Sequence, residues 1–387
     1  MTARHPPPAS APVVVLGGGV VGLSAAYHLA RSGVRDIVLL ERDALGSGST
    51  CRAAGGVRAQ FSDPLNITLG ARSLETFREF PARFGQEIDF RQVGYLFLLS
   101  SPEAVAAFEA GVALQNHLQV PSRMISAAEA QRLSPLVSTE GLLAAAWSPT
   151  DGHCTPEAVV LGYANAARRS GVTLVPHCAA TGIDVTDGRI TGVRTQAGTI
   201  ATESVVCAAG AWSAEVGQWI GVDLPVTPLR RQVLVTEPVP DLDAHTPFTI
   251  DFETSFYFHG EGRGLLLGMS DPEETPGFKL TRSDAWLPRL GEAIARRAPA
   301  IGEIGIAGGW AGLYEMTPDH NALIGRADTV AGFLYATGFS GHGFLMGPAV
   351  GEVVRDLYLG EEPFVDVSSL DAGRFATVGA RPELTIV

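Results

Sequence analysis

Residues 13–22, VVVLGGGVVG, decide the fold of this chain. The first four are apolar, as is typical of a short strand buried on both faces of a parallel sheet. A helical pattern follows over residues 23–32 and stops at Gly33, a residue type that commonly ends helices. A second apolar run over residues 37–40 ends at Glu41. The sequence therefore predicts a βαβ unit in which a glycine-rich turn joins strand to helix.

The glycines in that turn, Gly17, Gly19 and Gly22, have the spacing Gly-x-Gly-x-x-Gly. In this pattern the first glycine permits a tight turn, the second lets the backbone approach a pyrophosphate, and the third lets the helix pack closely on the strand. The helix N-terminus adds free N–H groups and a positive dipole end. Glu41, 19 residues after Gly22, is placed to accept hydrogen bonds from a ribose. The turn predicts a dinucleotide site but does not distinguish FAD from NAD.

The composition excludes several classes of protein. The chain has 387 residues, 46% of them hydrophobic, which is enough for more than one domain with a sizeable core. Glycine, at 45 residues or about 12%, exceeds the usual share of roughly 7%, but no Gly-X-Y period indicates collagen. The net charge of −13 argues against a nucleic-acid partner and against adsorption to anionic membranes.

Two long stretches carry no Asp, Glu, Lys or Arg: one lies between Arg4 and Arg31, the other between Asp328 and Glu352. Both are interrupted by glycines and prolines and lack the flanks of a signal peptide, so neither is expected to span a membrane. We therefore expect a cytoplasmic protein. The four cysteines are scattered without a C-x-x-C pair, which favours reduced thiols and no metal site.

Several helix starts carry their own signals. Ser101 before Pro102, and Thr155 before Pro156, are typical of an N-cap followed by proline at the first helical position. Ser126 begins a capping-box pattern. Strand-like runs without intervening helices favour an antiparallel sheet in the second half of the chain; they cover residues 232–236, 256–258 and 264–268, and a further run covers 93–99.

Four more motifs follow the glycine turn in order: GSGSTCRAAGGVR at 46–58, VVCAAGAWS at 205–213, GLYEMTPD at 312–319 and YATGFSGHGF at 335–344. Together they resemble the D-amino-acid-oxidase superfamily of FAD-dependent enzymes over about residues 12–360. The most similar branch contains sarcosine oxidases, dimethylglycine dehydrogenases and the flavin subunits of proline dehydrogenase complexes. The resemblance implies FAD rather than NAD as the cofactor.

The implied fold is α/β (α+β overall): a Rossmann-like FAD-binding domain with a parallel sheet, interrupted by a mainly antiparallel β substrate domain with helices. We expect a disordered tail over residues 1–11. The boundaries that we predict are 12–90, 150–225 and 309–375 for the discontinuous FAD-binding domain, and 91–149 and 226–308 for the substrate domain.

The resemblance also assigns residues to the cofactor. The loop at residues 47–50 would pass the pyrophosphate, Ala180 would pair with adenine, and Gly210 would close the site near the ribityl chain. The helix that follows residues 338–343 would point its positive N-terminus at the flavin pyrimidine ring, where negative charge gathers on reduction. The full set expected to bind FAD is Gly17, Gly19, Val20, Val21, Gly22, Glu41, Arg42, Ser47, Gly48, Ser49, Thr50, Arg52, Ala180, Gly210, Trp212, Gly312, Leu313, Gly338, Ser340, Gly341, His342 and Gly343.

The sequence departs from the family at informative positions. Gly312 stands where sarcosine oxidases carry a cysteine that holds the flavin covalently, so we expect non-covalent FAD, with Cys51 as another conceivable point of attachment. Leu266 and Leu345 stand where monomeric oxidases carry lysines. Since the lysine above the flavin promotes reaction with oxygen, the departures favour a dehydrogenase, although Arg58 or His342 could supply the charge.

Four residues are expected to act on the substrate. Arg58 offers a bidentate fork for a carboxylate, with a buried structural pairing as its alternative. Tyr257 and Tyr314 would line the face opposite the flavin, and Tyr257 could equally be an ordinary sheet residue. His342 lies in the Gly-His-Gly turn, where it acts on substrate or only donates to the flavin or backbone. The basic pair that begins at Arg230 is expected on a solvated face, with a substrate contact as the less favoured reading.

The function expected from these residues is oxidation of a secondary or N-methylated amino acid (sarcosine-, dimethylglycine- or proline-like) to an imine by hydride transfer to flavin. The alternatives are a D-amino-acid or 2-hydroxy-acid oxidoreductase of the same fold, and a non-catalytic flavin-binding assembly protein. The expected partners are the amino-acid substrate and an electron acceptor (oxygen, a quinone or an electron-transfer protein), with an oligomer or heteromeric complex left open.

Overall fold

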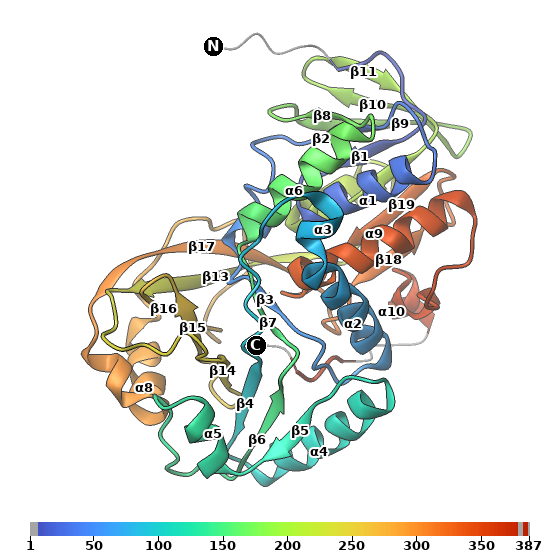
Figure 1. Ribbon diagram of the computed structural model, residues 1–387. Helices are drawn as coiled ribbons and strands as arrows, with labels where there is room; N and C mark the ends of the chain where they lie inside the picture. The colour runs from blue at the N-terminus through green and yellow to red at the C-terminus, as the bar shows by residue number, and fades with distance from the viewer. Residues whose placement is uncertain (1–6, 378–381, 386–387) are drawn as a thin grey trace.

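The computed structural model describes residues 7–377 and 382–385 and has two large sheets (Figure 1). The sheet that holds β1 lies in the upper part of the view, among the helices α1, α6 and α9. The other sheet lies below it, with α4, α5 and α8 at its periphery. The long strands β13 and β17 extend from the lower sheet toward the upper one, so the two parts of the molecule meet along them.

The upper sheet has six strands in the order β18-β19-β12-β1-β2-β8 and is parallel except for the edge strand β18. Its core is formed by the apolar strand residues and helices α1, α6 and α9. The parallel sheet predicted from the first βαβ unit is thus confirmed. Its strands are β1 Val14–Leu16, β2 Val38–Leu40, β8 Thr173–Val175, β12 Val205–Cys207, β18 Leu323–Arg326 and β19 Phe333–Thr337.

The lower sheet has eight strands in the order β17-β13-β16-β15-β14-β4-β6-β5, and every pair in it is antiparallel except β14 with β4. The mainly antiparallel sheet that the sequence predicted is therefore present. The strands are β4 Tyr95–Leu99, β5 Arg123–Ile125, β6 Ala144–Ser148, β13 Thr227–Thr236, β14 Phe248–Asp251, β15 Tyr257–Glu261, β16 Gly264–Met269 and β17 Ile306–Met316.

Two smaller sheets complete the strands: β9 Ala180–Thr186, β10 Arg189–Thr195 and β11 Gly198–Ala201 form one, and β3 Gly56–Val57 with β7 Gly152–His153 the other. The helices are α1 Val20–Arg31, α2 Pro64–Arg78, α3 Phe80–Phe84, α4 Pro102–His117, α5 Ala127–Leu133, α6 Pro156–Arg169, α7 Ser213–Gln218, α8 Leu287–Arg297, α9 Gly343–Leu359 and α10 Arg374–Thr377. Among the described residues, no helix has both the length and the apolar content that a bilayer crossing requires.

The predicted domain division stays a proposal, because β17 crosses the boundary placed at residue 309 and belongs to the lower sheet over its whole length. Residues 1–6 of the expected tail lie outside the described residues. The last part of that tail is packed: Ser10 bridges to Ala201 on β11, and Ala11 is buried.

Candidate active site

A cavity of about 470 Å³ is lined by residues of both large sheets. It brings together 23 of the 25 residues predicted to bind FAD or act on the substrate, from the glycine turn near residue 17 to His342 and Gly343. The two exceptions are Gly22 and Gly338, which do not line the cavity. The sequence prediction therefore describes one place in the fold, although the individual roles of these residues remain proposals.

The glycine turn has the backbone geometry that the pattern requires. Gly17 has a φ of 112°, and a Cβ there would lie 2.1 Å from the Ala208 carbonyl oxygen. A Cβ on Gly22 would lie 2.0 Å from the carbonyl oxygen of Gly17. Gly22 thus serves the close packing of helix on turn, which explains why it lies behind the cavity wall and not in it.

Two helix N-termini open onto this cavity. α1 begins after Gly19 and α9 after His342; neither cap residue makes a side-chain capping bond, and neither first turn holds an acidic residue. Gly19 and His342 both line the cavity. Uncapped N–H groups with a positive dipole end favour an anionic or electron-rich ligand at each position.

Polar contacts fix the loops around the glycine turn. Glu41 accepts a hydrogen bond from the Gly18 amide at 2.8 Å, and the Thr50 hydroxyl oxygen accepts one from the Val20 amide at 3.1 Å. Ser49 donates to the Leu313 carbonyl of β17 at 2.6 Å. The loop predicted to pass the pyrophosphate is therefore tied to α1 and to β17 of the lower sheet.

The wall near the end of β2 contains the residues expected at the adenine and ribose. Arg42 lies over the ring of Trp212 at 3.6 Å, and Ala180, at the start of β9, lines the cavity with Cys178. The ring of Phe278 also stacks on Trp212, with ring centroids 5.2 Å apart. A wall with these aromatic and apolar side chains suits a planar base.

The chain matches the model of the FAD dependent oxidoreductase family, DAO, over residues 12–357. It belongs to that family. The enzyme is therefore an FAD-dependent oxidoreductase, and the uncapped helix ends and glycine turn of its cavity fit a bound dinucleotide. FAD, predicted from the motifs, is confirmed as the cofactor by the family and by the flavoenzymes among its structural neighbours.

Relatives of the enzyme include amine dehydrogenases. It is 31% identical to dimethylglycine dehydrogenase, mitochondrial, of Rattus norvegicus over 94% of this chain and 45% of the relative. It is also 31% identical to sarcosine dehydrogenase, mitochondrial, of Homo sapiens, over 96% of this chain and 42% of the relative. The chain thus spans less than half the length of these relatives. Its own location in the cytoplasm stays a prediction.

Solved structures with the same fold are matched over nearly their full length. L-proline dehydrogenase from P. horikoshii superposes with a TM-score of 0.91 and 34% identity, covering 97% of this chain and 100% of that one. Glycine oxidase from Geobacillus kaustophilus gives a TM-score of 0.84 and 26% identity, covering 95% and 99%. These matches confirm the predicted α/β fold class.

The contacts around the two possible points of covalent attachment support non-covalent FAD. At Gly312, a Cβ would already lie 2.9 Å from the Cβ of Arg52, whose guanidinium donates to the Ala311 carbonyl at 2.7 Å. Cys51 does not line the cavity. Burial, with a smaller contribution from Glu157, raises the pKa of Cys51 to about 12, so its nucleophilic thiolate is disfavoured.

On the substrate side, Arg58 is buried and makes contacts within the protein. Its guanidinium donates to the Gln60 carbonyl, to the Thr385 carbonyl at 2.7 Å and to the Thr385 hydroxyl at 3.5 Å, and it lies 3.4 Å from Nε2 of His342. Burial and the Arg58 charge hold the pKa of His342 well below its usual value, so the imidazole is neutral and accepts from Arg58.

Both predicted tyrosines line the cavity. The Tyr257 ring covers Gly268, where a Cβ would lie 2.1 Å from the ring, and the Tyr314 ring covers Gly341 in the same way at 2.5 Å. Burial raises the pKa of both phenols, so each keeps its proton and can donate a hydrogen bond.

Sequence reasoning missed other residues of the wall. Tyr95 stacks on Phe248, with ring centroids 4.4 Å apart, and both line the cavity. Glu315 lines it too and accepts from the Gly338 amide at 3.0 Å, which explains the place of Gly338 behind the wall. Arg231, expected on a solvated face, also lines the cavity. The strict alternation of side chains along β13 is the signal that could have placed Arg231.

Glu383 anchors residues 382–385 beside Arg58. Its carboxylate accepts from the amide and hydroxyl of Ser62 at 2.9 and 2.6 Å, from Asn66 at 2.9 Å, from the Asp63 amide at 3.1 Å, and from the amide and hydroxyl of Thr385 at 3.0 and 2.7 Å. Although burial alone would raise the pKa of Glu383, these donors hold it well below its usual value.

Because the carboxylate of Glu383 is stabilised only when ionised, its contribution is present above the ordinary pKa of 4.5 and is lost as the pH falls through the lower pKa of the folded state. Glu383→Gln should therefore lower the free energy of unfolding by about 2 kcal/mol at pH 7. In urea unfolding of the holoenzyme, the difference from wild type should narrow below pH 4.5. Glu362→Gln, at an exposed position, is the control. A difference that is independent of pH would contradict this reasoning.

Proposed function

We propose that the enzyme oxidises a secondary or N-methylated amino acid, of sarcosine, dimethylglycine or proline type, to the imine and passes the electrons to an acceptor other than oxygen. The names of the relatives support an amine of this kind, and the 34% identity to L-proline dehydrogenase over the whole of that chain supports it further. A D-amino acid or a 2-hydroxy acid is the second candidate, and the likeness to glycine oxidase supports a primary amino acid over a 2-hydroxy acid.

One observation carries the proposal: two guanidinium groups line the same cavity as the rings of Tyr257 and Tyr314. We call this part of the cavity the aromatic chamber. Arg58 and Arg231 both line the cavity, and the ring of Tyr314 lies 5.1 Å from the Arg231 guanidinium. Both positive charges lower the pKa of Tyr314 against the effect of its burial, so this phenol is within the electrostatic influence of both arginines. A small anion with an apolar or amine-bearing body fits such a chamber.

The residues of the chamber act by binding and desolvation. A guanidinium holds the substrate carboxylate, and the buried aromatic walls favour the neutral amine, because a low-dielectric site disfavours its ammonium form. Neutral His342 adds no positive charge that would repel an amine. Bound FAD would supply the acceptor for a hydride from the substrate C–H bond next to nitrogen. A secondary amine then loses its N–H proton to water and becomes the imine, whereas a tertiary amine such as N,N-dimethylglycine stays as the iminium. Water hydrolyses either product.

The charges near the cavity favour a dehydrogenase over an oxidase. Leu266, expected at the position of the oxygen-activating lysine, is buried on β16. Lys279, the one lysine in the sequence, is bound to Glu274 at 2.7 Å and does not line the cavity. Oxygen therefore lacks a lysine charge that would stabilise its reduced form, and a quinone or an electron-transfer protein is the acceptor that we propose.

Anaerobic mixing of the holoenzyme with candidate substrates tests this function. Sarcosine, N,N-dimethylglycine or L-proline should bleach the flavin band, whereas D-alanine and lactate should not. Readmitted air should restore the colour slowly. Bleaching by D-alanine or lactate alone would move the substrate to the second candidate. Fast recolouring would indicate an oxidase, and a flavin that no substrate bleaches would favour a non-catalytic flavoprotein.

A further inference from the structure

We propose that Arg231, and not Arg58, binds the substrate carboxylate, an inference that rests on the amino-acid oxidation proposed above. The two guanidinium groups line the same cavity, but their environments differ. The protein's own acceptors occupy the terminal nitrogens of Arg58, whereas Arg231 is held on the sheet with its Nε unpartnered.

The terminal nitrogens of Arg58 are occupied. Nη1 faces the Gln60 carbonyl and the Thr385 hydroxyl, and Nη2 faces the Thr385 carbonyl and Nε2 of His342. A guanidinium has four hydrogens on its terminal nitrogens, and each of these four acceptors can take one. A carboxylate that approached Arg58 would have to displace contacts that the protein itself supplies.

The segment that occupies Arg58 is firmly held. Glu383, two residues before Thr385, accepts from Ser62, Asp63 and Asn66 at the start of α2. Its amide in turn donates to the Asp319 carbonyl at 3.1 Å. The carbonyl and hydroxyl of Thr385 are therefore fixed beside Arg58, because the nearby Glu383 carboxylate accepts several hydrogen bonds.

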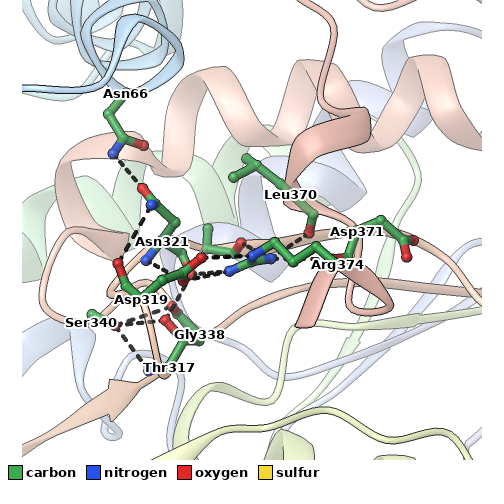
Figure 2. A network of polar contacts seen from close by, with 10 residues as sticks. Asn66, Thr317, Asp319, Asn321, Gly338, Ser340, Leu370, Asp371 and Arg374 are labelled. Atoms are coloured by element: carbon green, nitrogen blue, oxygen red, sulfur yellow. Dashed lines mark hydrogen bonds and ion pairs between the residues drawn. The ribbon is translucent and has the colours of Figure 1, made fainter. Parts of the chain in front are cut away.

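Figure 2 shows how the Asp319 loop is itself fixed. Arg374 donates to both carboxylate oxygens of Asp319, at 2.9 and 2.8 Å, and to the Asn321 carbonyl at 3.0 Å. Asn66 donates to the Asn321 side chain at 2.7 Å and also to Glu383. Both charged members of the ion pair are buried. This network makes the partners of Arg58 a permanent part of the wall.

Arg231 lies on β13, where side chains alternate between the faces of the sheet. Its neighbour Arg230 points the other way and forms an ion pair with buried Glu274 at 2.6 Å. Arg231 points into the cavity over Tyr314. Among residues 7–377 and 382–385, no carboxylate lies within 4.0 Å of Arg231, as is also true of Arg58. Nη1 of Arg231 donates to the Arg230 carbonyl at 3.2 Å, whereas its Nε has no hydrogen-bond partner.

A buried guanidinium without a counter-ion is unstable, since desolvation disfavours its charge. Burial accordingly lowers the pKa of Arg231, and the acids Glu274 and Asp271 oppose that effect less than the phenols of Tyr314 and Tyr257 do. A carboxylate in the chamber supplies the missing charge and acceptors. Tyr314 and Tyr257, which line the same cavity, then favour a small amino-acid body.

The test compares two probes that differ in charge: tetrahydrofuran-2-carboxylate, which has the shape of proline without its oxidisable amine, and tetrahydrofuran-2-carboxamide. Their dissociation constants for the oxidised holoenzyme are measured by calorimetry and by perturbation of the flavin absorbance. The variants are Arg231→Met, Arg231→Lys and Arg58→Met, with Arg194→Met, at an exposed position on β10, as the matched control. Flavin content is measured for each.

We expect the wild type to prefer the carboxylate by roughly 10- to 100-fold. Arg231→Met should reduce that preference to near unity, and Arg231→Lys should keep part of it because the charge remains without the fork. Arg58→Met should weaken both probes alike, and Arg194→Met should change neither. A preference that survives in Arg231→Met but vanishes in Arg58→Met overturns the inference.

Three other outcomes also overturn it. Arg231→Met could lose flavin while the molecules that still hold flavin prefer the carboxylate probe as strongly as wild type does. In that case Arg231 binds the cofactor and not the substrate. If the wild type binds neither probe and no amino acid bleaches its flavin, the proposed function fails and the inference fails with it. Binding of the carboxylate with an unchanged preference in Arg231→Met leaves the function standing and removes only the role of Arg231.

Discussion

Gly17→Ala is expected to yield a protein without bound flavin and with a free energy of unfolding lower by about 3 kcal/mol or more. The added Cβ would lie 2.1 Å from the Ala208 carbonyl oxygen, and the backbone at φ 112° is one that alanine rarely adopts. The steric overlap and the backbone strain act at once. The turn must move away from β12, and with it the α1 N-terminus that faces the cavity.

Gly33→Ala separates these two causes. Gly33 has a φ of 100°, but a Cβ there would meet no atom within 4 Å, and the residue does not line the cavity. The Gly33→Ala variant should lose about 1–2 kcal/mol of unfolding free energy through backbone strain and should retain its flavin. The measurements are flavin content per chain after purification and urea unfolding. Normal flavin content in Gly17→Ala, or flavin loss in both variants, would contradict the steric explanation.

Arg374→Met should produce the second large effect, a loss of about 3–5 kcal/mol in the free energy of unfolding. The Arg374–Asp319 pair is almost completely buried, with side-chain exposures of 5% and 1%. Removing the guanidinium leaves a carboxylate in the interior without its main counter-charge. The loop of Asp319, which also accepts from the Glu383 amide, loses its support (Figure 2).

A surface pair provides the control for this prediction. Arg123 and Glu129 lie 2.7 Å apart with 53% and 29% exposure, and Arg123→Met should change the free energy of unfolding by less than about 1 kcal/mol. The double change Arg374→Met with Asp319→Asn should recover part of the loss, because the uncompensated charge is removed. Equal stability of Arg374→Met and Arg123→Met in urea would refute the assignment.

Local signals predicted local structure well. Ser101 and Ser126 cap α4 and α5 as the sequence indicated, each accepting a backbone amide at 3.2 Å. Thr155 marks the start of α6 although its side chain makes no capping bond. In each case the residues that interact lie within one helical turn, so their spacing in the sequence is enough to bring them together.

The nucleotide half of the cavity could also be predicted, because a glycine turn, a helix N-terminus and Glu41 belong to one βαβ unit. The motifs further along the chain located the rest by their resemblance to a family. Tyr95 and Phe248 escaped prediction since they meet only through the parallel pairing of β4 with β14. No spacing in the sequence announces a contact of that kind.

The sequence by itself determined the βαβ unit, the FAD cofactor and 23 of the residues that line the cavity, since these depend on short spacings and on motifs with fixed order. The tertiary structure decided what the arginines do. Arg58 meets Thr385 across a separation of 327 residues, and Arg230 and Arg231 differ only in the face of β13 to which they point. Such assignments depend on which distant segments the folded chain brings together. The acceptors beside Arg58 use its donors, whereas Arg231 keeps an unpartnered donor toward the cavity.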